Sequence, residues 1–269
     1  MAGKKDWEKT LTIYWSDELN DDFDELGLER PKVPDNYNYK RGPISNFLCS
    51  VLYHVFAKPF LGIYCYFHGI RYVGRKNLKA LHGQGAFIYA NHVAITDVFK
   101  FQSQLFFFKR KVNILGYPDS LTIPVAKHLV KGLGLLPVPT SGDLKHMIEL
   151  EETCEYYVKK KKQHVIIFPE AHIWPYYTHI RNFKSGSFIY PAKANAPVVP
   201  IVTTFKKKRF GKKPKQVVYV CPPIFPREDL NIQENKEYLH DECLKAMKLI
   251  AENTEQYEYV KYIKVDKKD

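Results

Sequence analysis

From Ile44 onward, the apolar residues follow a helical repeat. They recur at spacings of three and four residues, which is the period of one helix face. The positions that follow this repeat are Ile44, Phe47, Leu48, Val51, Leu52, Val55 and Phe56. Lys58-Pro59 then interrupts it, and a second apolar stretch begins at Phe60. We expect two helices, each shorter than the ~20 apolar residues that cross a bilayer. The pattern fits a hairpin half-embedded in one leaflet and fits two core helices equally well.

After residue 80, short apolar runs alternate with segments of helical period. The runs that predict strands are 86–90, 112–115, 133–138, 164–168, 198–202 and 217–220. The segments that predict helices are 98–108, 121–130, 144–161, 186–194 and 236–253. Alternation of this kind is typical of the α/β class, with a largely parallel central sheet flanked by helices. Active sites in such sheets lie at the carboxyl ends of the strands.

We divide the chain into three segments on this basis. Residues 1–43 form a polar N-terminal arm with an acidic patch at 17–25. Residues 44–80 form an apolar two-helix motif that associates with a membrane, and residues 81–269 form the α/β domain. We interpret the arm as an appendage, or a lid, that lies on the main domain.

The chain carries a large positive charge. Its 41 Lys and Arg residues outnumber 29 Asp and Glu residues, for a net charge of +12. Such a charge attracts nucleic acid or an anionic lipid surface. The basic clusters lie at 159–162, 206–209 and 212–215, and each alone also fits a solvated loop. Beside the apolar stretches they favour an anionic membrane surface, and no nucleic-acid-binding fingerprint accompanies them.

The five cysteines and the N-terminal residues indicate the cellular compartment in which the chain resides. No C-x-x-C pair or zinc spacing occurs, and residues 1–6 contain no apolar segment of a secretory signal. We therefore expect reduced cysteines and a peripheral or monotopic position on the cytoplasmic face of the cell membrane.

The candidate chemistry begins with Asn91-His92 at the end of a predicted strand, followed five residues later by Asp97. On one continuous helix these two side chains would point about 140° apart, so they meet only if a turn intervenes. The junction between strand and helix supplies that turn. A carboxylate bonded to one ring nitrogen of a histidine orients it as a general base. Taken singly, His92 also fits an incidental strand-end residue, and Asp97 fits a helix N-terminal acid.

No covalent nucleophile accompanies this pair. The chain has no G-x-S-x-G elbow, and Ser187 follows a basic loop instead of a strand. We therefore expect the substrate to bring the hydroxyl that His92 activates. The predicted reaction is direct acyl transfer, without an acyl-enzyme.

Four blocks resemble the glycerolipid acyltransferase superfamily, which includes 1-acylglycerol-3-phosphate acyltransferases. Asn91-His92-x-x-x-x-Asp97 is similar to its N-H-x-x-x-x-D motif. The other three blocks follow in the family's order: residues 132–138 (Gly-Leu-Gly-Leu-Leu-Pro-Val), 165–170 (Val-Ile-Ile-Phe-Pro-Glu) and 198–202 (Val-Val-Pro-Ile-Val). The likeness runs from about residue 45 to about residue 225.

The resemblance implies roles for these residues. His92 takes the proton of an acceptor hydroxyl, Asp97 orients His92, Glu170 helps to bind the acceptor, and Pro200 positions its strand beside the site. The hydroxyl belongs to a lysophospholipid or a related glycerolipid or glycolipid. The acyl group comes from a thioester of coenzyme A or acyl carrier protein, which is a substrate, so no cofactor is implied.

The third block departs from the family pattern. The family has Gly, then Ser or Thr, then Arg after the glutamate, whereas this chain has Ala171, His172 and Ile173. A second family arginine aligns with Thr140. Arginine suits phosphate oxygens, so we expect Arg181 and Lys184 to replace it, or an acceptor without phosphate there. We predict an acceptor site formed by Asn91, Glu170, His172, Arg181 and Lys184.

Two further features bear on the site. The aromatic insert at 174–177 fits either an acceptor pocket that stacks on a sugar or simple packing. His172 and His179 have no common metal-ligand spacing, so we expect no metal. The alternative to an enzyme is a non-catalytic lipid-binding relative, and the retention of both His92 and Asp97 argues against it.

Overall fold

The computed structural model describes residues 7–23, 31–40, 42–103, 110–118, 126–140 and 142–266. Within these ranges a seven-stranded sheet runs through the centre, in the order β2-β8-β7-β3-β6-β4-β5. Its strands are β2 (Arg71–Val73), β3 (Phe87–Ala90), β4 (Val112–Gly116), β5 (Leu135–Pro137), β6 (His164–Ile167), β7 (Val198–Lys206) and β8 (Lys215–Val220). Neighbouring strands are parallel except β7 and β8. The predicted α/β class with a largely parallel sheet is confirmed.

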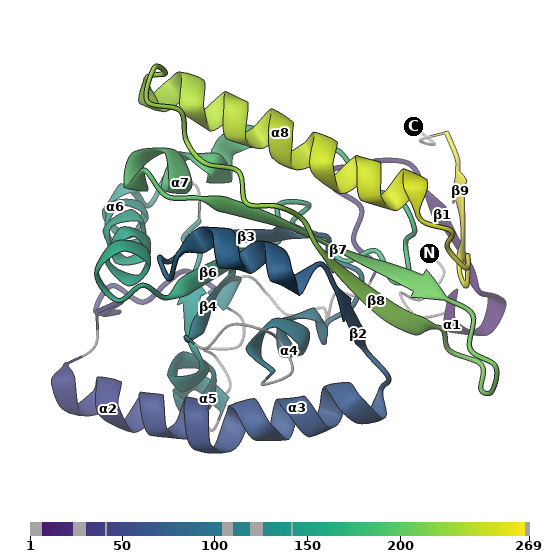
Figure 1. The fold of residues 1–269 in the computed structure, drawn as a ribbon, viewed down its shortest axis with the longest axis horizontal. Coiled ribbons are helices and arrows are strands. Elements are labelled where there is room, and N and C mark those ends of the chain that lie inside the picture. The colour runs from purple at the N-terminus through teal and green to yellow at the C-terminus, as the bar shows by residue number, and fades with distance from the viewer. Residues whose placement is uncertain are drawn as a thin grey trace.

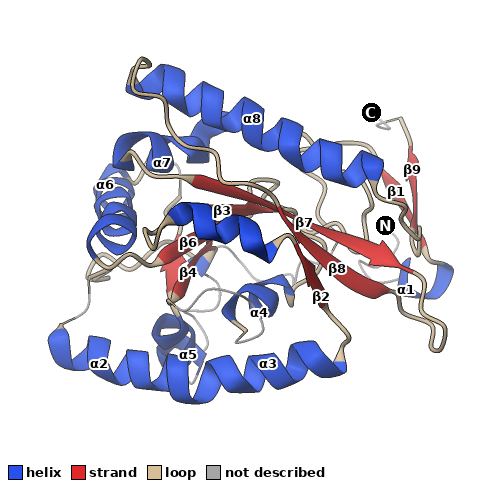
Figure 2. Cartoon of the chain, in the orientation of Figure 1, coloured by secondary structure: helices blue, strands red, loops and turns tan. Residues whose placement is uncertain are grey.

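Helices cover both faces of this sheet (Figures 1 and 2). One face packs against α6 (Leu144–Glu155), α7 (Ile189–Ala194) and α8 (Ile232–Asn253). The other face packs against the 3₁₀ helix Arg75–Leu81 and α4 (Asp97–Gln102). Strands buried on both faces favour apolar residues at successive positions, which explains why β3, most of β6 and the first half of β7 appear in the sequence as continuous apolar runs.

The apolar N-terminal segment is one continuous helix, and the prediction of two helices was wrong. It comprises α2 (Pro43–Val51), a π-helical turn (Leu52–Ala57) and α3 (Lys58–Phe67). A proline within a helix lacks an N–H group and clashes with the carbonyl four residues earlier. Here the backbone N–H of Lys58 donates to Tyr53 O, five residues back, immediately before Pro59. The π turn thus accommodates the proline, and the helix continues.

This N-terminal helix lies along one side of the molecule, beyond α4 and α5 (Ala126–Leu133) (Figure 1). Its contact with α5 is close, because a Cβ atom on Gly132 would lie 3.2 Å from Leu52 Cδ2. With 25 residues it is long and apolar enough to cross a membrane by length and composition. Along one side this helix also contacts α4 and α5.

Several predicted boundaries differ from the structure. The strand expected at 133–138 is shorter, since Gly134 has a φ of 107° and turns the chain between α5 and β5. The helices expected at 98–108 and 121–130 extend into 104–109 and 121–125, which lie outside the described residues. The predicted helix at 144–161 consists of α6 and a π turn (Tyr156–Lys160), and α8 begins before the predicted residue 236.

The two ends of the described chain pair with each other, which the sequence did not indicate. After α1 (Trp7–Thr10), β1 (Thr12–Trp15) forms a small parallel sheet with β9 (Lys261–Lys264). This sheet brings Trp15 and Tyr262 against Trp174. The N-terminal arm is therefore attached beside the loop that follows β6.

Candidate active site

The candidate residues lie where the central strands end. β3 lies between β6 and β7 and is parallel to both, so the segments after these strands meet at one edge of the sheet. The Asn91 side chain continues the pairing of β3 with β7. Its Nδ2 donates to Thr203 O (3.0 Å), and its Oδ1 accepts from Thr203 N (2.8 Å). Asn91 therefore fixes the backbone from which His92 projects.

His92 and Asp97 are brought together by a turn. His92 Nδ1 lies 3.1 Å from Asp97 Oδ2. The same oxygen accepts the backbone N–H groups of Val93 (2.7 Å) and Ala94 (2.9 Å). The carboxylate thus folds the strand-to-helix junction around itself while it holds the imidazole. The contact expected from the sequence is present, and its catalytic role stays a prediction.

Asp97 is fully buried and ionised. Burial would raise the pKa of this carboxyl, but the Lys100 ammonium and the His92 ring outweigh burial and lower the pKa to about 2. Lys100 forms an ion pair with Asp97 Oδ1 and donates to Thr203 Oγ1 (3.1 Å). The sequence reasoning missed Lys100, although its position three residues after Asp97 on one helix face could have indicated it.

The His92 ring has two neighbours and stays partly exposed. Its Nδ1 faces Asp97, and the ring stacks on Phe168, with centroids 4.2 Å apart. The side chain retains 15% of its exposure. When Nδ1 carries the proton, Nε2 is the basic nitrogen. The geometry therefore provides an imidazole that a carboxylate orients and that stays partly exposed.

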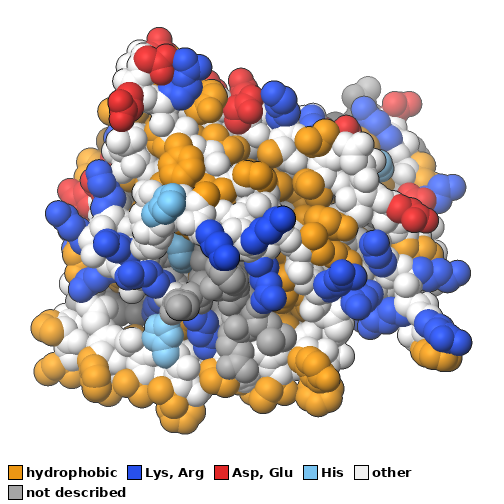
Figure 3. Space-filling model, viewed as in Figure 1, with side chains coloured by type: hydrophobic (Ala, Val, Ile, Leu, Met, Phe, Trp, Pro, Cys, Tyr) orange, Lys and Arg blue, Asp and Glu red, His pale blue; other side chains and the backbone are white. Residues whose placement is uncertain are grey.

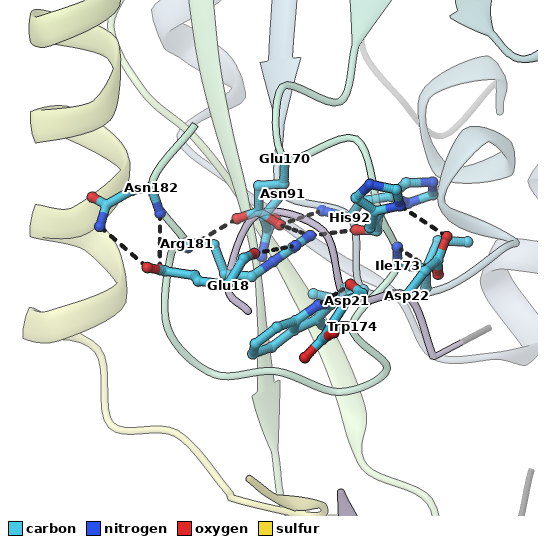
Figure 4. A network of polar contacts seen from close by, with 12 residues as sticks. Glu18, Asp21, Asp22, Asn91, His92, Glu170, Ile173, Trp174, Arg181 and Asn182 are labelled. Carbon is cyan, nitrogen blue, oxygen red and sulfur yellow. Dashed lines mark hydrogen bonds and ion pairs between the residues drawn. The ribbon is translucent and has the colours of Figure 1, made fainter. Parts of the chain in front are cut away.

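Glu170 joins this site through a buried ion pair with Arg181 (Figure 4). Glu170 Oε2 accepts from the His92 backbone N–H (3.2 Å) and from Arg181 Nη2 (3.2 Å), and its Oε1 accepts the Arg181 backbone N–H (3.2 Å). Burial raises the pKa of the Glu170 carboxyl, although the Arg181 charge opposes that shift. The pair ties the segment after β6 to the backbone of His92.

Arg181 is positioned by protein groups on several sides. Its guanidinium donates to the carbonyls of His172 and Glu18 and lies 4.8 Å from the centre of the Trp174 ring. The side chain is 1% exposed. The guanidinium is thus directed at Glu170 and at backbone carbonyls, so its contacts are with the folded chain itself. The expected role as a phosphate clamp remains untested.

The N-terminal arm also contacts this segment (Figure 4). His172 Nδ1 lies 3.1 Å from Asp22 Oδ2, and the Ile173 N–H donates to Asp22 Oδ1 (3.3 Å). The Trp174 indole N–H donates to Asp21 O (2.8 Å). No short-range sequence pattern could have indicated Asp22, because 150 residues separate it from His172. Asp24 and Glu25 of the acidic patch lie outside the described residues.

Two predicted features lie elsewhere. Lys184 is exposed at the start of the 3₁₀ helix Ser185–Phe188, and within the described chain no hydrogen bond or ion pair joins it to the site. Trp174 is fully buried and packs against Trp15, Phe23 and Tyr262. Of the two interpretations of the aromatic insert, Trp174 supports packing. Among the described residues, no group of three His, Cys, Asp or Glu side chains is placed to hold a metal ion.

Comparison with known proteins agrees with this architecture. The family model described as "Acyltransferase" matches residues 69–204, more than half of the chain. The solved 1-acyl-sn-glycerophosphate (LPA) acyltransferase PlsC from Thermotoga maritima superimposes with a TM-score of 0.50 at 13% identity, over 79% of this chain and 99% of that chain. That likeness shows the fold alone. A search of curated proteins found no match. On the family match, the chain belongs to the acyltransferase family.

Proposed function

We propose that this protein transfers a fatty acyl chain from an acyl thioester to the hydroxyl of a lysophospholipid or a related glycerolipid or glycolipid. The observation that carries the proposal is the oriented His92 ring, with Nδ1 held by an ionised Asp97 and the ring partly exposed. The family match supports acyl transfer as the class of reaction. The sequence resemblance and the PlsC likeness point to a lipid acceptor.

In the proposed reaction, His92 Nε2 removes the proton from the acceptor hydroxyl. The oxygen attacks the thioester carbonyl, and a new C–O bond forms. The C–S bond then breaks, and the imidazolium returns its proton to the departing sulfur of coenzyme A or acyl carrier protein. Asp97 stays ionised throughout and stabilises the imidazolium. A low pKa suits Asp97 to this role because the carboxylate remains an anion.

We further propose that the protein works at an anionic membrane surface, on the cytoplasmic side. The N-terminal helix exposes a row of apolar side chains along its length: Ile44, Phe47, Leu48, Val51, Val55, Phe56, Phe60, Ile63, Tyr66 and Phe67. Figure 3 shows hydrophobic side chains along this edge, with Lys and Arg side chains on the adjoining surface. Apolar area next to basic charge is typical of interfacial membrane binding.

The test of the enzymatic proposal is the His92→Ala variant. Removing a general base lowers turnover by about 10²–10⁴-fold, and the fold should persist because the His92 side chain is partly exposed. The assay measures ester formation from acyl coenzyme A or acyl carrier protein on a panel of lysolipids in vesicles. The matched control is His68→Ala, since His68 is exposed and bonds to Tyr64 O of the preceding turn.

Assays of the wild type and of His92→Ala separate an enzyme that uses His92 from the alternatives. Wild-type turnover in His92→Ala would remove the proposed base. If the wild-type protein binds lysolipids but forms no ester from either thioester, the chain is a lipid-binding relative and not an enzyme.

A further inference from the structure

A pocket lies at the ends of β4 and β6 that are opposite to the His92 site. Its walls include Lys111, immediately before β4, and Gln163, immediately before β6. Glu170 follows the other end of β6, and His92 follows the same end of the neighbouring parallel strand β3, so the pocket and the His92 site lie at opposite ends of the strands. The pocket has a volume of about 310 Å³, which is near the lower end of the ~300–1,000 Å³ of small-ligand sites.

The N-terminal helix forms the other wall of this pocket. Asn46, Ser50 and His54 line it together with Phe47. The first three are spaced by four residues, so they form one polar stripe along the helix. Phe47, Val51 and Val55 lie next to that stripe and are exposed. The pocket therefore opens beside the apolar row that faces the proposed membrane.

Two lysines supply the charge of the lining. His54, Lys111 and Lys161 line the pocket, and no acidic residue is among the described residues that do so. The ammonium groups of Lys58 and Lys111 both lie near the Tyr53 ring, 5.9 Å and 5.3 Å from its centre. Burial, together with the charges of Lys58 and Lys111, lowers the pKa of His54. The neutral form of His54 is therefore favoured, and the positive charge of the lining comes from Lys161 and from Lys111, whose Nζ also donates to Gly132 O (2.7 Å).

We propose that this pocket binds the phosphate of an anionic lipid headgroup in the bilayer, apart from the acyl acceptor. Lys161 supplies an exposed charge, and Ser50 and Asn46 supply hydrogen-bond donors from the helix. The inference rests on the proposed membrane orientation but not on catalysis. A headgroup held here fixes the position of the N-terminal helix at the surface, so that the His92 edge of the sheet keeps one orientation relative to the lipid.

The test compares co-sedimentation of the full chain with neutral phosphatidylcholine vesicles and with vesicles that also contain phosphatidic acid. Ser50→Phe fills the pocket without changing charge and adds apolar area. We expect this variant to bind neutral vesicles at least as tightly as the wild type and to lose most of the preference for phosphatidic acid. Lys161→Gln should reduce that preference by roughly tenfold to hundredfold, the range of a charged hydrogen bond.

The matched control is Lys160→Gln, an exposed neighbour of the same charge that does not line the pocket. A lysine that acts only as surface charge contributes about fivefold. If Lys160→Gln and Lys161→Gln lose equal amounts, or Ser50→Phe keeps the wild-type preference, the lysines act as diffuse charge and the pocket proposal is overturned.

A further arm separates a lipid from a free phosphate. Inorganic phosphate is added during thermal unfolding of the wild-type and Ser50→Phe proteins. Stabilisation of the wild type alone by phosphate, without any vesicle preference, would assign the pocket to a soluble anion and reject the headgroup. The membrane orientation is tested independently of the pocket with a variant that lacks apolar side chains on the N-terminal helix. If the helix faces the membrane, this variant should lose binding to neutral vesicles.

Discussion

At the scale of single residues, Asp97 joins the backbone turn to the histidine. Its Oδ2 accepts from the His92 ring and from two backbone N–H groups, while its Oδ1 faces the Lys100 ammonium. Asp97 and Lys100 are both almost fully buried. Removing one partner of a buried ion pair leaves an uncompensated charge, which costs more than the pair itself contributes. Stability and catalysis can therefore be separated at this position.

We predict that Asp97→Asn destabilises the fold by about 3–5 kcal/mol, the usual cost of breaking a buried pair, and lowers turnover. The double variant Asp97→Asn/Lys100→Met removes the stranded ammonium and should recover much of the free energy of unfolding, but not the turnover. Urea unfolding and an ester-formation assay on the same samples check both. Recovery of full activity in the double variant would contradict the orienting role of Asp97.

A pH dependence follows from the same carboxyl. The pKa of Asp97 is lowered from 3.8 to about 2 in the folded chain. Its contribution, about 2 kcal/mol at 1.36 kcal/mol per unit, is present above the unfolded pKa and is lost as the pH falls toward the folded pKa. We expect the stability difference between wild type and Asp97→Asn to shrink between roughly pH 5 and roughly pH 2. A constant difference in urea unfolding across that window would refute this linkage.

The sequence predicted the residues of the site unevenly. His92 and Asp97 are five residues apart, so a local motif predicts both, and the strand end predicts the turn between them. Arg181 and Glu170 also fall within one loop. Asp22 comes from the arm, and its contact with His172 depends on β1 pairing with β9 at the far end of the chain.

At the scale of elements, Trp174 connects three segments. Its ring packs on Trp15 of β1 and on Tyr262 of β9, with the Arg181 guanidinium on the ring as well. Its backbone N–H donates to His92 O (3.1 Å), so the segment after β6 is attached to the segment after β3. The aromatic insert thus holds the arm against the candidate site.

We predict that Trp174→Ala destabilises the chain by about 3–5 kcal/mol, the cost of truncating a buried aromatic side chain. It should also release the arm, so that limited proteolysis cuts between β1 and the N-terminal helix at lower protease concentration. Phe210→Ala serves as the control, because Phe210 is 80% exposed and surface substitutions usually change stability by less than about 0.5 kcal/mol. Equal stability of the two variants would argue against this connecting role.

The N-terminal helix illustrates why sequence patterns misplace boundaries. Lys58-Pro59 is a strong signal for a break, because proline removes a donor and clashes with the preceding turn. The π turn before it widens the helix by one residue and removes the conflict. This turn packs against the domain, where Gly132 lies close to Leu52, and the local sequence does not contain that contact.

At the scale of the whole molecule, the helix and α8 lie on opposite sides (Figure 1). The helix exposes Val55 and Phe56, while α8 exposes Leu249. A protein that rests on a bilayer by the helix inserts the first two side chains and leaves the third in water. An exposed apolar side chain is therefore expected to contribute to membrane binding on the side of the N-terminal helix and not on the side of α8.

We predict that Val55→Ser/Phe56→Ser weakens binding to neutral phosphatidylcholine vesicles by about a hundredfold or more, since buried side chains of this size contribute about 1.5–3 kcal/mol each. Leu249→Ser should bind as the wild type does. Co-sedimentation measures both. Equal binding of the two variants would place the membrane contact on another surface.

The sequence by itself determined the α/β class, the strand runs of the central sheet and the pairing of His92 with Asp97. Each of these rests on short-range signals: apolar periodicity, and two residues across one turn. Only the tertiary structure decided that the apolar segment is a single helix, that Arg181 neutralises Glu170, and that the arm reaches His172 through β1 and β9. The first and the last depend on contacts between residues far apart in the chain, and the ion pair depends on how the loop after β6 folds, so none of them follows from local periodicity.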